Sequence, residues 1–74
     1  MPFVLIYERE GRNETQKAAV VKDITLAMAK HFNIPEHSVR IIFNELREDQ
    51  IGIGGWLESS SEYKAKAKSE GFTV

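Results

Sequence analysis

Two short apolar runs flank a long stretch with helical spacing, and this arrangement predicts a β-α-β unit. Residues 3–7 read Phe-Val-Leu-Ile-Tyr, which is typical of a strand buried on both faces. Residues 39–43 read Val-Arg-Ile-Ile-Phe and predict a second strand. Because a long helix separates them, we expect the two strands to be parallel, with a right-handed crossover.

The segment between the strands predicts an amphipathic helix of about five turns. Asn13 can cap its N-terminus, and Gln16 stands three residues later, where its side chain can bond back to the cap. Apolar side chains then recur at three- and four-residue spacing until Asn33 and Pro35 end the helix. The intervening charged residues fall on the solvent side of this helix: Lys17, Lys22, Asp23 and Lys30.

The remainder of the chain predicts smaller elements and no second domain. Residues 46–55 are polar and then rich in glycine, which indicates a tight turn or a short hairpin. Residues 60–69, rich in Ala, Lys, Glu and Ser, predict a short solvated helix. With no internal repeat or linker, residues 1–74 are expected to form one domain of the α+β class.

This small chain is expected to need a partner for stability. One helix covers one face of a two-stranded sheet, yet both predicted strands are apolar on both faces. The chain has no cysteine for disulfides, and its only histidines, His31 and His37, are too few for a structural zinc site. Oligomerisation remains, and it would extend the parallel two-stranded unit into a larger sheet.

The charge pattern excludes several partners. Ten basic and eleven acidic residues are intermixed, with a net charge of −1, so there is no nucleic-acid footprint and no polybasic membrane patch. The apolar run at residues 3–7 is too short for a signal peptide or a membrane span. We therefore expect a soluble cytoplasmic protein that binds neither nucleic acid nor membranes.

Pro2 is the first candidate for chemistry. Removal of Met1 would make it an N-terminal secondary amine at the start of a rigid strand. A free α-amino group has a pKa of about 7.7–8.0, and burial or nearby cations lower an amine pKa toward the value a general base needs. Taken alone, a Pro after the initiator Met is common and indicates no function.

Three arginines are candidates for binding an anion. Arg40 interrupts an apolar strand, where a charge must be paired or must face a cavity, and its planar fork suits a carboxylate. The alternative for Arg40 is an edge position with its head in solvent. Arg9 and Arg12 lie near the predicted helix N-terminus, which attracts anions, although a solvated turn explains them as well.

These residues also form an ordered pattern that resembles a known family. Met1-Pro2, Glu10-Gly11-Arg12, Gln16-Lys17, Ser38-Val39-Arg40 and Gly52-Ile53-Gly54-Gly55 follow one another. From residue 2 to about residue 57 the pattern resembles the 4-oxalocrotonate tautomerase family, which leaves residues 58–74 as a C-terminal extension. The resemblance implies a β-α-β subunit of a homo-hexamer, a trimer of dimers, that uses no metal and no cofactor.

The resemblance further implies a role for each site residue. Pro2 would be the general base and then the acid in the enol–keto tautomerisation of a small enol or dienol carboxylate such as 2-hydroxymuconate. Arg12 matches the arginine that holds the distal carboxylate. Arg40 matches the arginine that a neighbouring subunit contributes to grip the 2-oxo carboxylate end. Ser38 matches a residue that lines the pocket.

Two positions depart from the family's pattern. Ile51 stands where the typical enzyme has a Phe that keeps the pocket dry, so the pocket shape is expected to change. Arg9 replaces an apolar residue and is expected to favour a dianionic substrate. An arginine there resembles the α-subunit of trans-3-chloroacrylic acid dehalogenase, although Ile53 replaces the Glu that activates water in that relative. The alternatives are a hetero-oligomeric subunit, a hydratase or dehalogenase, and a non-catalytic anion-binding assembly protein.

Overall fold

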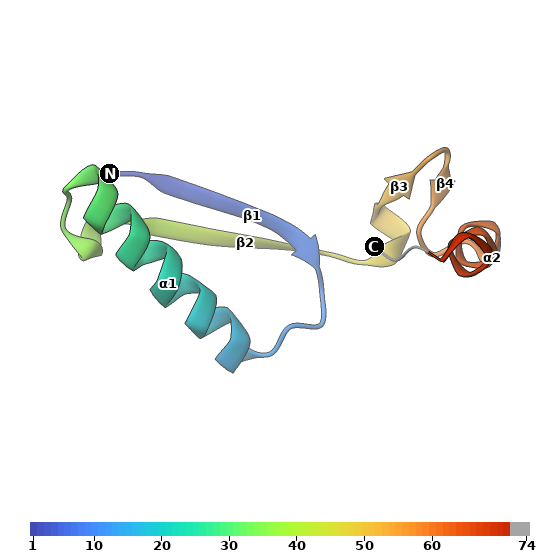
Figure 1. The fold of residues 1–74 in the computed structure, drawn as a ribbon, viewed down its shortest axis with the longest axis horizontal. Coiled ribbons are helices and arrows are strands. Elements are labelled where there is room, and N and C mark those ends of the chain that lie inside the picture. Colours follow the sequence, from blue (N-terminus) through green and yellow to red (C-terminus); the bar gives the residue numbers. More distant parts are fainter. Residues whose placement is uncertain (72–74) are drawn as a thin grey trace.

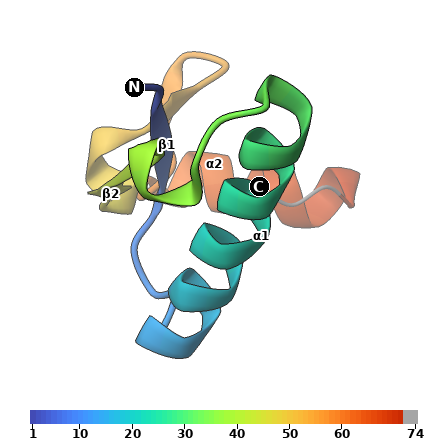
Figure 2. The ribbon, with the colours of Figure 1, turned by 90° about the vertical axis from the view of Figure 1, so that its left-hand side faces the viewer.

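The predicted β-α-β unit is confirmed by the computed structural model, which describes residues 1–71. Strand β1 (Phe3–Arg9) leads into helix α1 (Glu14–Phe32), and strand β2 (Arg40–Leu46) pairs with β1 in parallel (Figure 1). Both strands continue past the apolar runs, because backbone pairing extends to Arg9 opposite Leu46. Figure 2 shows α1 lying to one side of this two-stranded sheet. The fold is a small α+β unit.

The ends of α1 follow from the residues that cap it. The Asn13 side chain accepts a hydrogen bond from the backbone N–H of Gln16 at 2.8 Å, and the Gln16 side chain accepts one from the N–H of Asn13 at 3.1 Å. This reciprocal pair satisfies two N–H groups that the helix leaves unpaired. At the other end Asn33 adopts a left-handed conformation with φ of 55°, which ends the helix.

Short elements lie on both sides of β2. A 3₁₀ turn (Glu36–Ser38) precedes β2, and another (Glu48–Gln50) follows it. Strands β3 (Gly52–Ile53) and β4 (Trp56–Leu57) form the expected hairpin, and α2 (Ser61–Glu70) ends the described chain. The two hairpin-turn residues, Gly54 and Gly55, have φ of 59° and 96°. A two-residue hairpin turn with positive φ at both positions favours glycine.

Residues 48–71, here called the C-terminal module, lie beyond the carboxyl ends of β1 and β2 (Figure 1). The predicted helix at residues 60–69 is present, but it is not solvated all round, because Tyr63 is buried at 5% exposure. Lys64 pairs with Glu48 at 3.1 Å, and the Lys66 ammonium lies 4.9 Å from the centre of the Trp56 ring. These contacts hold α2 against the 3₁₀ turn (Glu48–Gln50) and the hairpin.

The chain alone has almost no core. Its Cα radius of gyration is 16.5 Å, whereas a compact domain of this length has about 11 Å. Its accessible surface is 5657 Å², roughly 1,000 Å² more than expected for a compact monomer of this mass. Within residues 1–71, Tyr63 is the one apolar side chain that is buried. The single chain is therefore more extended and less buried than a compact domain of its length.

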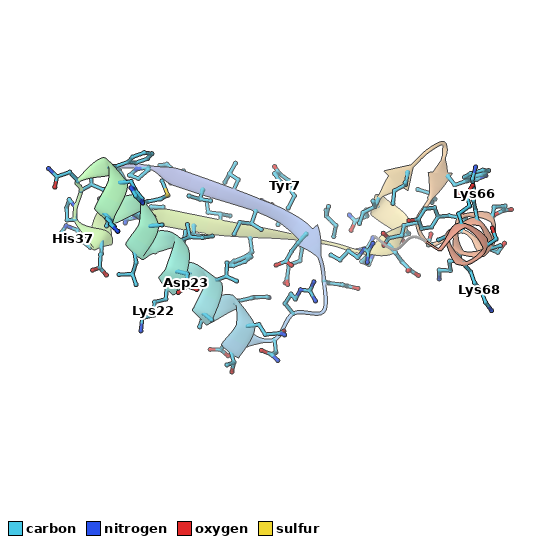
Figure 3. The ribbon with its side chains drawn as sticks, viewed as in Figure 1. Tyr7, Lys22, Asp23, His37, Lys66 and Lys68 are labelled. Carbon is cyan, nitrogen blue, oxygen red and sulfur yellow. The ribbon has the colours of Figure 1, made fainter. Side chains whose placement is uncertain are left out.

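The sheet face opposite α1 is apolar and left open. Four side chains on this face are 44–67% exposed: Phe3, Leu5, Tyr7 and Ile42. Figure 3 shows Tyr7 projecting away from α1, while Lys22 projects from the far side of that helix. An apolar face of this kind is typical of a surface that another chain covers. No helix within residues 1–71 is long and apolar enough to span a membrane.

Candidate functional site

Three of the predicted site residues lie together at the end of the sheet where β1 and β2 begin. The backbone N–H of Arg40 donates to the carbonyl of Pro2 at 2.9 Å, which ties the N-terminus to β2. Ser38 ends the turn just before β2, and its hydroxyl donates to the carbonyl of Pro35 at 2.8 Å. Pro2 and Ser38 are half-buried. The sheet therefore fixes the position of Pro2 through its own backbone.

Arg40 lies on the open face of the sheet. It is paired in register with Phe3, and it is exposed. Its guanidinium donates to the backbone carbonyl of His37, which lies in the turn before β2 (Figure 3). Among residues 1–71 this guanidinium forms no ion pair with a carboxylate. In the single chain Arg40 thus occupies the solvent-facing edge position, with its charge available to an anion.

The other predicted residues, Arg9, Arg12 and Ile51, meet at the opposite end of β1. They line a pocket of about 370 Å³, and Arg12 also lines a second pocket of about 320 Å³ between α1 and the sheet. The first pocket is lined by Tyr7, Glu8, Arg9, Arg12, Leu46 and Ile51. The second is lined by Ile6, Glu8, Arg12, Gln16, Lys17, Val20 and Phe43.

The cations of this second group all have carboxylate partners. Arg9 forms an ion pair with Glu58, whose side chain is only 6% exposed. Arg12 Nε lies 3.5 Å from Oε1 of Glu8. No local pattern in the sequence points to Glu58, because it lies in the C-terminal module, far along the chain from Arg9. Glu8 could have been noticed as a carboxylate on the α1-facing side of β1.

The prediction that Lys17 faces solvent is wrong. Its ammonium lies 2.6 Å from Oε2 of Glu45 and 5.9 Å from the centre of the Phe43 ring, and its side chain is 29% exposed. Both partners belong to β2, so Lys17 is directed at the sheet. A carboxylate and an aromatic ring both attract an ammonium group, and the spacing of apolar residues in the helix takes no account of this attraction.

The single chain does not bring the two groups of site residues together. Strand β1 has seven residues, which span about 20 Å, and the groups lie at its opposite ends. Neither of the two pockets that Arg12 lines is lined by Pro2. Within residues 1–71 no three His, Asp or Glu side chains are grouped as metal ligands would be.

Comparison with protein families gives one match along most of the chain. The family described as Tautomerase, with members described as tautomerase enzymes, matches residues 2–65. A 2-hydroxymuconate tautomerase of Pseudomonas putida is 37% identical over 59 residues, which cover 80% of this chain and 94% of that protein.

Solved structures agree with the sequence comparison. A 4-oxalocrotonate tautomerase homologue superposes with a TM-score of 0.78 at 31% identity, over 82% of this chain and 97% of the homologue. A heterohexamer 4-oxalocrotonate tautomerase of Chloroflexus aurantiacus J-10-fl superposes with a TM-score of 0.74 at 30% identity, over 82% and 98%. The chain therefore belongs to the tautomerase family and is an isomerase with the 4-oxalocrotonate tautomerase fold.

Proposed function

We propose that this chain is an enol–keto tautomerase of small 2-hydroxy-enoate or 2-hydroxy-dienoate carboxylates, with Pro2 as the base. The observation that carries the proposal is the fixed position of Pro2 directly before β1, where its carbonyl accepts a hydrogen bond from the backbone N–H of Arg40. Met1 is 74% exposed, so an aminopeptidase can reach it. Its removal converts the Pro2 nitrogen from an amide, which cannot accept a proton, into a secondary amine.

The reaction then needs one proton carrier and one group that stabilises negative charge. The Pro2 amine removes the proton from the 2-hydroxyl group, the C–O bond becomes a carbonyl, and the double bond shifts along the chain. Pro2 then returns the proton to the carbon that has gained electron density, which yields the ketone. Arg40 holds the carboxylate and 2-oxo oxygens and stabilises the charge that develops there.

The complete site is proposed to form between copies. Arg40 would come from a neighbouring copy, as the resemblance implies, while Arg12 and Ile51 would form the distal end of the pocket and Ser38 would line it near Pro2. We propose a homo-hexamer built as a trimer of dimers, in which the open sheet face is covered. Because one relative of similar fold is a heterohexamer, a hetero-oligomer is the second candidate. A native mass measurement of the purified protein distinguishes a homo-oligomer from a hetero-oligomer. A homo-oligomer has a mass that is a multiple of one subunit mass.

The central experiment follows ketonisation of 2-hydroxymuconate and phenylenolpyruvate by ultraviolet absorbance. Intact mass first establishes whether Met1 has been removed. Arg40→Ala is expected to lower kcat about 10²-fold or more, as loss of a charge-stabilising donor does. Pro2→Ala keeps a primary amine at the terminus, so its rate should fall without reaching zero.

Controls separate the proposed roles from general damage. Arg47→Ala removes an exposed guanidinium just after β2, where it pairs only locally with Asp49, and it should leave the rate unchanged. A preparation that retains Met1 should be inactive. Wild-type rates in both Pro2→Ala and Arg40→Ala would rule out the assigned roles.

A further inference from the structure

We propose that the substrate carries one carboxylate and an uncharged, apolar or aromatic distal end, rather than a carboxylate at each end. This inference rests on the proposed function and defines the substrate class of the same site. It is carried by the charges around the two pockets at the end of β1. Each cation that lines them, namely Arg9, Arg12 and Lys17, has its own carboxylate.

Arg9 forms an ion pair with a buried carboxylate, and loss of this pair would be costly. The Glu58 side chain is 6% exposed, and Arg9 is its ion-pair partner. If Arg9 turned to a substrate carboxylate, Glu58 would remain charged and buried without a counter-ion, which is strongly unfavourable. The expectation that Arg9 favours a dianion does not agree with this pairing. Arg9 instead links β1 to the C-terminal module.

Arg12 is more exposed than the carboxylate beside it. Its side chain is 65% exposed and its pair with Glu8 is long, at 3.5 Å, so the pair itself is weak. Glu8, however, is only 24% exposed on a paired strand, and it lines both pockets. An anionic group that reached Arg12 would therefore also meet the Glu8 carboxylate.

The third cation and the pocket walls lead to the same conclusion. Lys17 lies 2.6 Å from Glu45, so its charge is also balanced. The three pairs together carry no net formal charge. The rest of the lining is mainly aliphatic and aromatic: Ile6, Tyr7, Val20, Phe43, Leu46 and Ile51. Such a surface suits a ring or an alkyl group better than a second carboxylate.

Arg40 completes the charge count of the proposed site. Its guanidinium donates to the carbonyl of His37, and within residues 1–71 it has no carboxylate partner. One guanidinium without a counter-ion matches one substrate carboxylate, which is the 2-oxo acid end. The distal end of the substrate then contacts pocket walls whose charges are already neutralised.

The test compares two substrates in the assembled protein without Met1. 2-Hydroxymuconate carries two carboxylates, whereas phenylenolpyruvate carries one carboxylate and a phenyl ring. We expect a higher kcat/KM for phenylenolpyruvate in the wild type. Glu8→Gln keeps the size of the side chain and removes its charge, so it should shift the kcat/KM ratio toward 2-hydroxymuconate by about tenfold or more.

Glu10→Gln is the matched control. Glu10 lies just after β1, is exposed, and does not line either pocket, so the same loss of charge there should leave the ratio near its wild-type value. A wild-type preference for 2-hydroxymuconate would overturn the inference. So would a Glu8→Gln shift no larger than that of Glu10→Gln.

A binding measurement keeps this test separate from that of the proposed chemistry. Calorimetric titration with cis,cis-muconate and with cinnamate compares a dianion with an aromatic monoanion, and neither can be ketonised. Tighter binding of cinnamate, with muconate gaining affinity in Glu8→Gln, supports the substrate class even if no enol is turned over. Tighter binding of muconate by the wild type would refute it whatever the rates show.

Discussion

Replacement of Leu5 by Asp is expected to abolish assembly and, with it, folding. Leu5 lies opposite Ile42 at the centre of the open sheet face, and it is 55% exposed in the single chain. Phe3, Tyr7 and Ile42 on the same face are 62%, 67% and 44% exposed. A neighbouring chain that covers this face would bury the remaining half of each of these four side chains.

Burial of the open sheet face is expected to contribute a large free energy relative to the stability of a small domain. Complete burial of one such side chain contributes about 1.5–3 kcal/mol, so half-burial of four contributes roughly 3–6 kcal/mol per chain. An Asp at position 5 would remove the contribution of Leu5 to this burial free energy. It would also add the cost of burying a carboxylate, which is several kcal/mol. A total folding free energy near 5–15 kcal/mol cannot absorb this loss in every copy.

Light scattering after gel filtration and circular dichroism measure the outcome together. The wild type should elute as an oligomer with native helical signal, and Leu5→Asp as a smaller species with much of that signal lost. Leu5→Ala should remain assembled, with a lower urea midpoint. Lys22→Asp, on the solvent side of α1, serves as the control. A Leu5→Asp chain with the wild-type mass and midpoint would show that no chain covers this face.

Three further variants test single contacts, each by urea unfolding of the assembled protein. Asn13→Ala should cost about 1 kcal/mol, because the Gln16 N–H loses its cap acceptor; an unchanged midpoint would mean that the capping box is unimportant. Arg9→Met should cost about 3 kcal/mol by stranding the Glu58 carboxylate, and the double variant with Glu58→Leu should recover most of that loss. If the double variant is as unstable as the single one, the pair is not the cause. Gly55→Ala should cost about 1 kcal/mol, since Gly55 has φ of 96°, and a neutral effect would contradict the turn geometry.

Local signals in the sequence were enough to predict the elements. The apolar runs fixed the two strands, and Asn13 and Asn33 marked the ends of α1, because capping depends on residues only a few positions apart. The glycines at 54 and 55 marked the hairpin for the same reason. The strand ends were missed because Glu8 and Arg9 are polar, yet their backbones continue the ladder.

Long-range pairings could not be predicted from the same signals. The partner of Arg9 is Glu58, and the partner of Lys17 is Glu45, in each case across a large separation along the chain. Helical periodicity placed Lys17 in solvent because it takes no account of a carboxylate on a facing strand. The resemblance to the family located the site residues, but their charge balance became visible only in three dimensions.

The near absence of buried side chains has a consequence for the life of the newly made polypeptide. A chain that forms its hydrophobic core only in contact with other copies should fold in a step that depends on their association. Its refolding half-time should therefore lengthen on dilution, and its melting temperature should rise with protein concentration. In the proposed oligomer, a chain that has not yet met its partners presents Phe3, Leu5 and Tyr7 to proteases and chaperones.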